Sequence, residues 1–126
     1  MSESPVKVTN LDNGVRVVSD TMNSVESVSL GAWFGIGTRN ESADVNGVAH
    51  LLEHMAFKGT NGRSAAAIAE EVEIVGGHLN AYTSREQTAY YAKLLKDDMS
   101  LGVDILSDIL QNSIFAELEL DRERNV

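Results

Sequence analysis

Apolar side chains recur with a period of two along the first third of the chain. Two short apolar-rich runs, 6–9 and 15–19, flank Asn13-Gly14, a dipeptide that favours a tight turn between paired strands. Residues 25–34 alternate more regularly, which predicts a strand with one buried face. The side chains expected on that face are Val28, Leu30, Ala32 and Phe34.

Trp33 interrupts the polar side of the same strand, so we expect the second face of the sheet to be partly covered. The polar segment 37–46 predicts a surface loop. Two further strands, 79–83 and 88–94, are rich in tyrosine and threonine and are joined by the polar residues 84–87.

In the remaining segments, apolar residues recur at the spacing of a helix. One helix is predicted over 47–58, and a second follows the N-cap Ser64 as far as Gly76-Gly77. A long helix opens at Asp97-Asp98, and the charged segment 117–126 is also predicted to be helical. The buried stripes expected are Ile68, Val72 and Val75 for the second helix, and Leu101, Ile105 and Ile109 for the long one.

This order of strands and helices predicts an α+β fold, with a mixed, mostly antiparallel sheet and helices packed on one face. The chain has 126 residues, of which 43% are hydrophobic, enough for one globular domain spanning 1–126. No apolar run is long enough to cross a bilayer. The N-terminal residues show neither a signal nor a transit peptide, which predicts a cytoplasmic protein.

Charge and cysteine content narrow the possible functions. Nineteen acidic against ten basic residues give a net charge of −9, which argues against a nucleic-acid partner because phosphate binding needs a basic surface. The chain has no cysteine, so disulfides, thiolate catalysis and cysteine-ligated zinc are excluded. A metal bound here would need histidine or carboxylate ligands.

The predicted helix 47–58 separates its side chains onto two faces. One face carries an apolar stripe suited to the core, made of Val48, Leu51, Leu52 and Met55. The same spacing repeats on the opposite side with His50, Glu53, His54 and Phe57. The two histidines therefore share a face with a carboxylate and stay off the core stripe.

Histidines at positions i and i+4 of a helix can both bind one zinc ion. Zinc lowers the pKa of a bound water to about 7, and Glu53 lies on the same face, where it can take that water's proton. His-x-x-Glu-His is the inverse of the His-Glu-x-x-His pattern of many zinc peptidases. The alternative is a solvent-facing helix side that carries these residues by chance. His78 stands alone after a glycine pair and is interpreted as a structural or surface residue.

The segment NGVAHLLEHMAFKGT resembles the core signature of the pitrilysin and mitochondrial-processing-peptidase family of inverted zinc peptidases. The segments LDNGVRVV, GTRNE and GGHLNAYTSREQTAYYA resemble further segments of that family, in the same order along the chain. The resemblance covers nearly the whole sequence.

This resemblance implies a zinc-dependent endopeptidase that cleaves extended peptides, unfolded polypeptides or presequences. In such an enzyme the substrate adds as a strand to an exposed sheet edge, so that recognition rests on backbone hydrogen bonds. The implied zinc ligands are His50 and His54, the implied general base is Glu53, and the implied substrate-binding residues are Phe57, Asn80 and Ala81.

The family's third zinc ligand is a glutamate in a pattern like E-R-x-V-x-x-x-E. Glu123 matches its first glutamate, which the resemblance implies to support the site without binding zinc directly. The ligand itself is expected beyond Val126, so the chain is expected to be a truncated N-terminal half-domain of a longer two-domain peptidase. A second homologous domain or subunit is the implied partner. Substitute ligands within the chain are Glu117, Glu119 and Asp121, and spacing does not distinguish among them.

Two other functions are considered. A non-catalytic structural module of the same fold is the alternative, because the third ligand is missing from the chain. S-ribosylhomocysteinases also use His-x-x-Glu-His, but they require cysteines that this sequence lacks.

Overall fold

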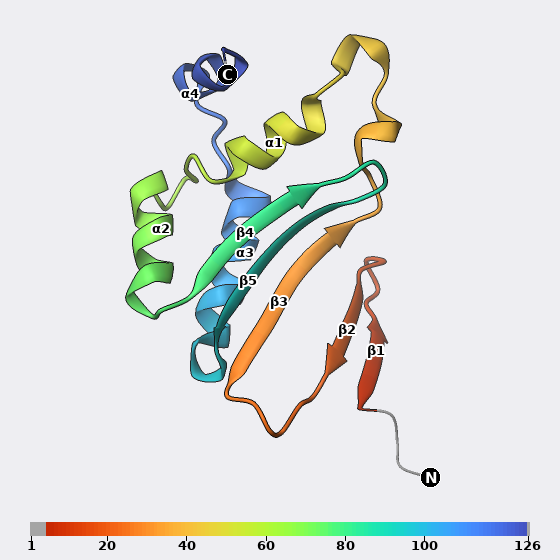
Figure 1. Cartoon of the computed structure of the whole chain (residues 1–126), viewed down its shortest axis with the longest axis vertical. Coiled ribbons are helices and arrows are strands. Elements are labelled where there is room, and N and C mark those ends of the chain that lie inside the picture. The colour runs from red at the N-terminus through yellow and green to blue at the C-terminus, as the bar shows by residue number, and fades with distance from the viewer. Residues whose placement is uncertain (1–4, 126) are drawn as a thin grey trace.

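The main sheet of this protein has three antiparallel strands, as seen in a computed structural model that describes residues 5–125. The strand order is β3 (Ser27–Phe34), β5 (Thr88–Leu95) and β4 (His78–Thr83), so β5 is central and β4 forms one edge (Figure 1). All strand pairs among the described residues are antiparallel, and the predicted parallel component is not among them.

The N-terminal strands β1 (Val6–Asn10) and β2 (Arg16–Asp20) form a separate two-stranded ladder (Figure 1). Gly14 has a φ of 88°, a left-handed conformation that suits glycine, and its N–H donates to the Leu11 carbonyl at 3.0 Å. The hairpin predicted from Asn-Gly is therefore confirmed. All residues of both strands are exposed, so the hairpin adds nothing to the core.

Four α-helices follow: α1 (Val48–Ala56), α2 (Ala65–Ile74), α3 (Met99–Asn112) and α4 (Glu117–Arg124). The helices α1, α2 and α3 contact the same three-stranded sheet and pack on one of its faces (Figure 1), which confirms the predicted α+β architecture. No helix within 5–125 is long and apolar enough to cross a membrane. Single turns of 3₁₀-helix cover Thr38–Asn40, Ala43–Val45 and Lys96–Asp98.

The predicted start and end of α2 are confirmed at atomic detail. The Ser64 hydroxyl accepts a hydrogen bond from the Ala67 N–H at 3.1 Å, which caps the first turn. The helix ends beside Gly76, whose φ of 69° turns the chain toward β4.

The core lies between the central strand and the helices. Alternate residues of β5 face the helices, and the isoleucines of α2 and α3 pack against them. Burial of one such side chain contributes roughly 1.5–3 kcal/mol to folding. The members of this core that are less than 5% exposed are Ile68, Ala92, Leu94, Ile105 and Ile109.

Three predictions about burial are wrong. Phe34, expected on the buried face of β3, is 43% exposed at the end of that strand. The apolar stripe of α1 reaches the core only at its C-terminal end: Met55 is 1% exposed, whereas Val48 and Leu52 are 38% and 44% exposed. The reason is that α1 contacts the edge strand β4 near the end of the sheet and does not lie across the sheet's centre (Figure 1). Trp33 is 59% exposed, because no described element covers the second face of the sheet.

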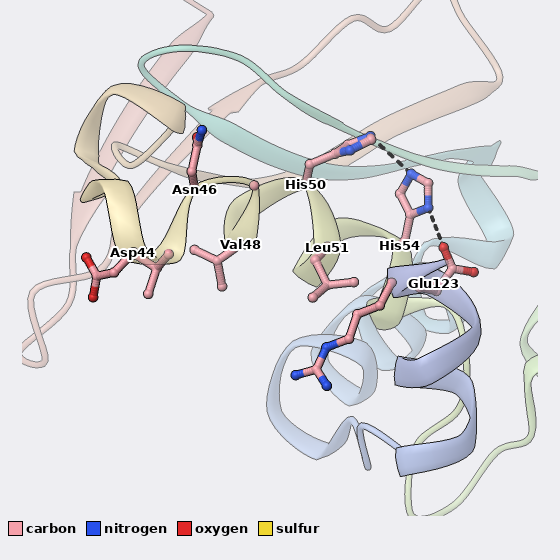
Figure 2. A pocket seen from close by; sticks show the side chains of 10 residues that line it. Asp44, Asn46, Val48, His50, Leu51, His54 and Glu123 are labelled. Atoms are coloured by element: carbon pink, nitrogen blue, oxygen red, sulfur yellow. Dashed lines mark hydrogen bonds and ion pairs between the residues drawn. The ribbon is translucent and has the colours of Figure 1, made fainter. Parts of the chain in front are cut away.

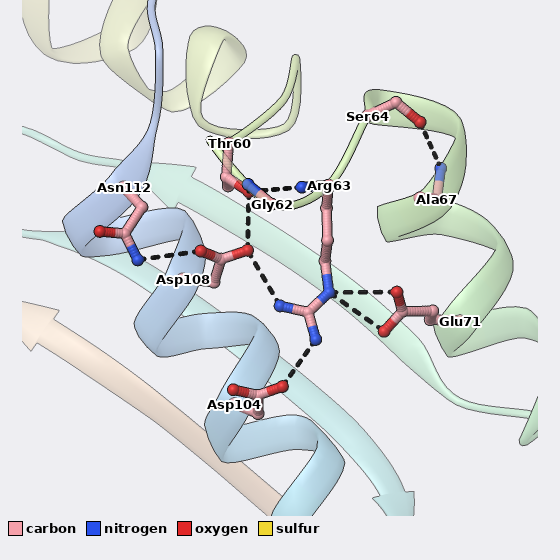
Figure 3. Close-up of polar contacts among 9 residues, drawn as sticks. All are labelled: Thr60, Gly62, Arg63, Ser64, Ala67, Glu71, Asp104, Asp108 and Asn112. Carbon is pink, nitrogen blue, oxygen red and sulfur yellow. Dashed lines mark hydrogen bonds and ion pairs between the residues drawn. The ribbon is translucent and has the colours of Figure 1, made fainter.

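Arg63, in the segment between α1 and α2, ties that segment to both neighbouring helices (Figure 3). Its guanidinium donates to Asp104 at 2.6 Å and to Asp108 at 2.9 Å on α3, and to both carboxylate oxygens of Glu71 on α2 at 3.1 Å. The bonds to Asp104 and then to Asp108 raise the pKa of Arg63. Thr60 adds a bond from its hydroxyl to Asp108 at 2.7 Å. These contacts fix where the chain leaves α1.

Replacing Arg63 with methionine is expected to lower the free energy of unfolding by about 2 kcal/mol. A hydrogen bond to a charged group contributes roughly 1.5–3 kcal/mol, and the exposure of Asp104 and Glu71 reduces that value. Urea unfolding of the 126-residue chain, followed by circular dichroism, measures the change. The control is Arg39→Met, which breaks an ion pair to Glu86 whose side chains are 65% and 73% exposed. Equal losses in the two variants would contradict a special role for Arg63.

Candidate active site

The helix that carries the His-x-x-Glu-His motif is held at its N-terminus by Glu41, a residue of the preceding loop. Gly47 precedes α1 with a φ of 93° and has no side chain that can cap the helix. The Glu41 carboxylate does so instead, accepting the N–H of Gly47 at 2.7 Å and that of Ala49 at 2.9 Å. These two bonds, with Gly47 first, lower the pKa of Glu41, so its carboxylate is ionised at neutral pH.

The two histidines of the motif point toward each other (Figure 2). The distance between the Nε2 atoms of His50 and His54 is 3.1 Å, and the ring centroids are 4.4 Å apart. Two nitrogens bound to one tetrahedral zinc at about 2.0–2.1 Å lie roughly 3.3 Å apart. The pair therefore has the separation that two ligands of a single zinc ion need.

Glu123, on α4, fixes the orientation of His54 (Figure 2). Its Oε2 lies 2.8 Å from Nδ1 of His54, and its Oε1 lies 3.1 Å from the ammonium of Lys58. The bond to His54, followed by that to Lys58, lowers the pKa of Glu123. The chain between α3 and α4 passes through Phe115, which has an unusual φ of 46° for a residue other than glycine, and α4 then packs against α1.

An ionised carboxylate can only accept a hydrogen bond, so the proton between Glu123 and His54 belongs to Nδ1 of the imidazole. Nε2 of a neutral His54 then carries a lone pair that faces Nε2 of His50 at 3.1 Å. A metal bound between the two rings would take this lone pair, as in other carboxylate–histidine–metal arrangements. The residues present thus fit two ligand positions of a zinc site. Within 5–125, however, no group of three or more histidine, aspartate or glutamate side chains converges as a complete metal site.

The third residue of the motif, Glu53, is held from the sheet. The hydroxyl of Thr83, the last residue of β4, donates to Oε2 of Glu53 at 2.5 Å. The phenol of Tyr90 on β5 is buried, which raises its pKa, and the negative charge of Glu53 adds a smaller effect in the same direction. Neither Thr83 nor Glu41 is predicted as a site residue from the sequence. Both lie inside the segments that carry the family resemblance, and this was the only signal for them.

The remaining predicted site residues lie at the end of α1 and on β4. Phe57, at the C-terminal end of α1, is half-buried against the core, with its ring 6.4 Å from that of Tyr90. Asn80 and Ala81 lie on β4, the edge strand, whose other side pairs with no described strand. The register with β5 places Asn80 on the helix-free face of the sheet. Their substrate-binding roles stay predictions, as does the catalytic role of Glu53.

The structure does not join the suggested substitute ligands to the histidine pair. Glu119 binds Arg122 at 2.6 Å, Asp121 lies 3.8 Å from Arg124, and Glu117 belongs to no metal-binding group among the described residues. His78 is exposed at the start of β4, in agreement with its interpretation as a surface residue.

An open pocket of about 630 Å³ borders the histidine pair (Figure 2). Its walls come from the N-terminal half of α1, the 3₁₀ turn before it and the C-terminal part of α4. His50, His54 and Glu123 line one side of this pocket, so small molecules and ions reach the pair from solvent.

Comparison with known proteins gives a consistent result. The family model described as Insulinase (Peptidase family M16) matches residues 16–126. The chain is 51% identical over its full length to a probable mitochondrial-processing peptidase subunit beta of Arabidopsis thaliana, of which it covers 24%. It is 46% identical over 96% of its length to the uncharacterized zinc protease YmxG of Bacillus subtilis, of which it covers 30%.

A solved structure agrees with these relatives. The crystal structure of a protease from Helicobacter pylori superposes with a TM-score of 0.90 at 28% identity, over 95% of this chain and 29% of that one. The chain therefore spans between 24% and 30% of the length of these proteins. Because the family model covers most of the sequence and the fold agrees, this chain belongs to the insulinase family of peptidases, Peptidase family M16.

Proposed function

We propose that this chain carries the catalytic helix of a zinc-dependent metalloendopeptidase. The observation that carries the proposal is the pair of Nε2 atoms of His50 and His54, 3.1 Å apart, with Nδ1 of His54 held by Glu123. Family membership supports the same conclusion, because relatives are named as zinc protease and processing peptidase.

Zn²⁺ would be held by His50 and His54 and by a third protein ligand from outside residues 5–125. It would supply a Lewis acid that polarises the scissile carbonyl and makes water nucleophilic at neutral pH. Glu123 orients His54 by accepting its Nδ1 proton. Lys58 offsets part of the charge on Glu123, so that this carboxylate is paired on both oxygens.

Glu53 would act as the general base. One of its carboxylate oxygens accepts a hydrogen bond from the Thr83 hydroxyl. The other oxygen is left to take the proton of the attacking water. The same carboxyl group then returns the proton to the amine that leaves. Its place on the helix face of the two histidines keeps this proton transfer beside the metal ligands.

The substrate would be an extended peptide, an unfolded polypeptide or a presequence that adds to the edge of β4 as a further strand. Such a strand is recognised mainly through backbone hydrogen bonds, which allows many side chains. Phe57 would help to form the pocket for the residue after the scissile bond, and a second homologous domain or subunit would complete the enzyme. The cytoplasmic location stays a prediction.

A non-catalytic module of the same fold is the second candidate. It is favoured by one observation, namely that the described residues hold no third ligand beside the histidine pair. The endopeptidase would bind zinc and hydrolyse peptides, whereas the non-catalytic module would do neither. One experiment on the intact protein therefore separates the two functions.

The test is chelator-sensitive peptide hydrolysis. The intact protein is incubated with 1,10-phenanthroline and assayed on an internally quenched peptide, with the non-chelating 1,7-phenanthroline as the control. We expect hydrolysis to stop only with the chelator and to return when zinc is added back. Hydrolysis that survives complete removal of zinc would contradict the proposal. A protein without zinc and without hydrolysis would support the non-catalytic module.

A further inference from the structure

The general base proposed above depends on a residue from another element. The bond from Thr83 Oγ1 to Glu53 Oε2 measures 2.5 Å, the length of a charge-assisted hydrogen bond to a carboxylate. It joins two residues 30 positions apart, one at the end of β4 and the other in α1. Within 5–125, Thr83 is the only hydrogen-bond partner of the Glu53 carboxylate.

The side chain of Thr83 is placed for this contact by the sheet register. Thr83 pairs with Thr88 on β5 and lies on the face of the sheet that α1 covers. Thr83 is half-buried, and the bond to Glu53 is partly shielded from solvent. A glutamate side chain loses up to about 2 kcal/mol of rotamer entropy when it is ordered, so an anchoring bond is needed to hold its carboxylate in one position.

A second link ties the end of β4 to α1. The N–H groups of Thr38 and Arg39 donate to the carbonyls of Ser84 and Arg85 in the β4–β5 turn, both at 3.0 Å. Glu41, two residues after Arg39 in the same loop, caps α1. The catalytic helix is therefore positioned against the end of β4 twice, at its N-terminus through this loop and at its middle through Thr83.

We propose that Thr83 is a positioning residue that aligns the carboxylate of Glu53 with the edge strand to which the peptide adds. The proposal rests on the proposed function, since it concerns the general base of that reaction. The Thr83 hydroxyl holds Oε2 and directs the other oxygen toward the reacting water. Because Thr83 belongs to β4, a peptide aligned on β4 is aligned with the base at the same time.

The test compares Thr83→Val, which keeps the shape and loses the hydroxyl, with Thr83→Ser, which keeps the hydroxyl. In the intact, zinc-loaded enzyme, we expect Thr83→Val to lower kcat about ten-fold, with KM and zinc content unchanged, because a misplaced catalytic group slows chemistry without weakening binding. Thr83→Ser is expected to stay within two-fold of the parent. The matched control is Thr88→Val on the neighbouring strand β5. It removes a threonine hydroxyl that donates to the Ile36 carbonyl at 2.9 Å. We expect its kcat to equal that of the unmutated enzyme.

Crystal structures of the 126-residue chain and its Thr83→Val variant provide a readout that needs no activity. We expect the Glu53 carboxylate to leave its position in Thr83→Val and to keep it in Thr83→Ser. An unmoved carboxylate in Thr83→Val, or a serine variant as impaired as the valine variant, would overturn the proposal. If the parent protein hydrolyses no peptide, the proposed function fails, and the crystal structures still decide whether Thr83 positions Glu53.

Discussion

Replacing Glu53 with glutamine is expected to reduce peptide turnover by roughly 10²–10⁴-fold, which is the range that a positioned general base contributes. Glutamine has the same size, and its amide oxygen can still accept the Thr83 hydroxyl, so the side chain keeps its place. It cannot accept a proton from water. We therefore expect zinc content and KM to stay as in the parent, while kcat falls. Steady-state kinetics on a quenched peptide and elemental analysis of the same sample measure both quantities.

The matched control for this variant is Glu73→Gln on α2, which removes a negative charge from an exposed helix position away from the motif. Its turnover should equal that of the parent. Undiminished turnover in Glu53→Gln would remove Glu53 from the reaction and leave its bond to Thr83 as a structural contact only. Loss of zinc together with turnover would instead make Glu53 part of the metal site.

Replacing His54 with alanine is expected to weaken zinc binding by more than 100-fold. Loss of an outer partner of a metal-bound histidine already costs about 10–100-fold in metal affinity, and His54 is the proposed ligand itself. We therefore expect zinc affinity to be lowest in His54→Ala, intermediate in Glu123→Gln and highest in the unmutated protein. Competition with a chromophoric zinc chelator, performed on the intact protein, measures all three affinities.

The chain provides its own control for this series. His78 is the third histidine, exposed at the start of β4 and remote in sequence from the motif, so His78→Ala should bind zinc as the parent does. His54→Ala also removes one of the two partners of Glu123, and thermal unfolding of the metal-free variants separates this structural effect from loss of the metal. Unchanged affinity in His54→Ala would exclude it as a ligand.

Much of the fold follows from local patterns. The period-two run of β3, the Asn-Gly turn of the first hairpin and the Ser64 cap of α2 are each determined by residues within a few positions of one another. The burial of α1 is different, because it depends on where the helix docks. A helix that meets the edge of a sheet leaves part of its apolar stripe outside the core, and the spacing of Val48 and Leu52 carries no information about that.

The candidate site divides in the same way. Helix geometry alone brings positions 50, 53 and 54 to one face, so the sequence by itself determined the histidine pair and the carboxylate beside it. The role of Glu123 was indicated only by the family resemblance, because no periodic pattern of nearby residues indicated it. Only the tertiary structure decided that Glu123 reaches His54 across 69 residues and that Thr83 reaches Glu53 across 30, because both contacts depend on how α4 and β4 pack against α1. Contacts between distant segments are set by the packing of whole elements, which no spacing within one element records.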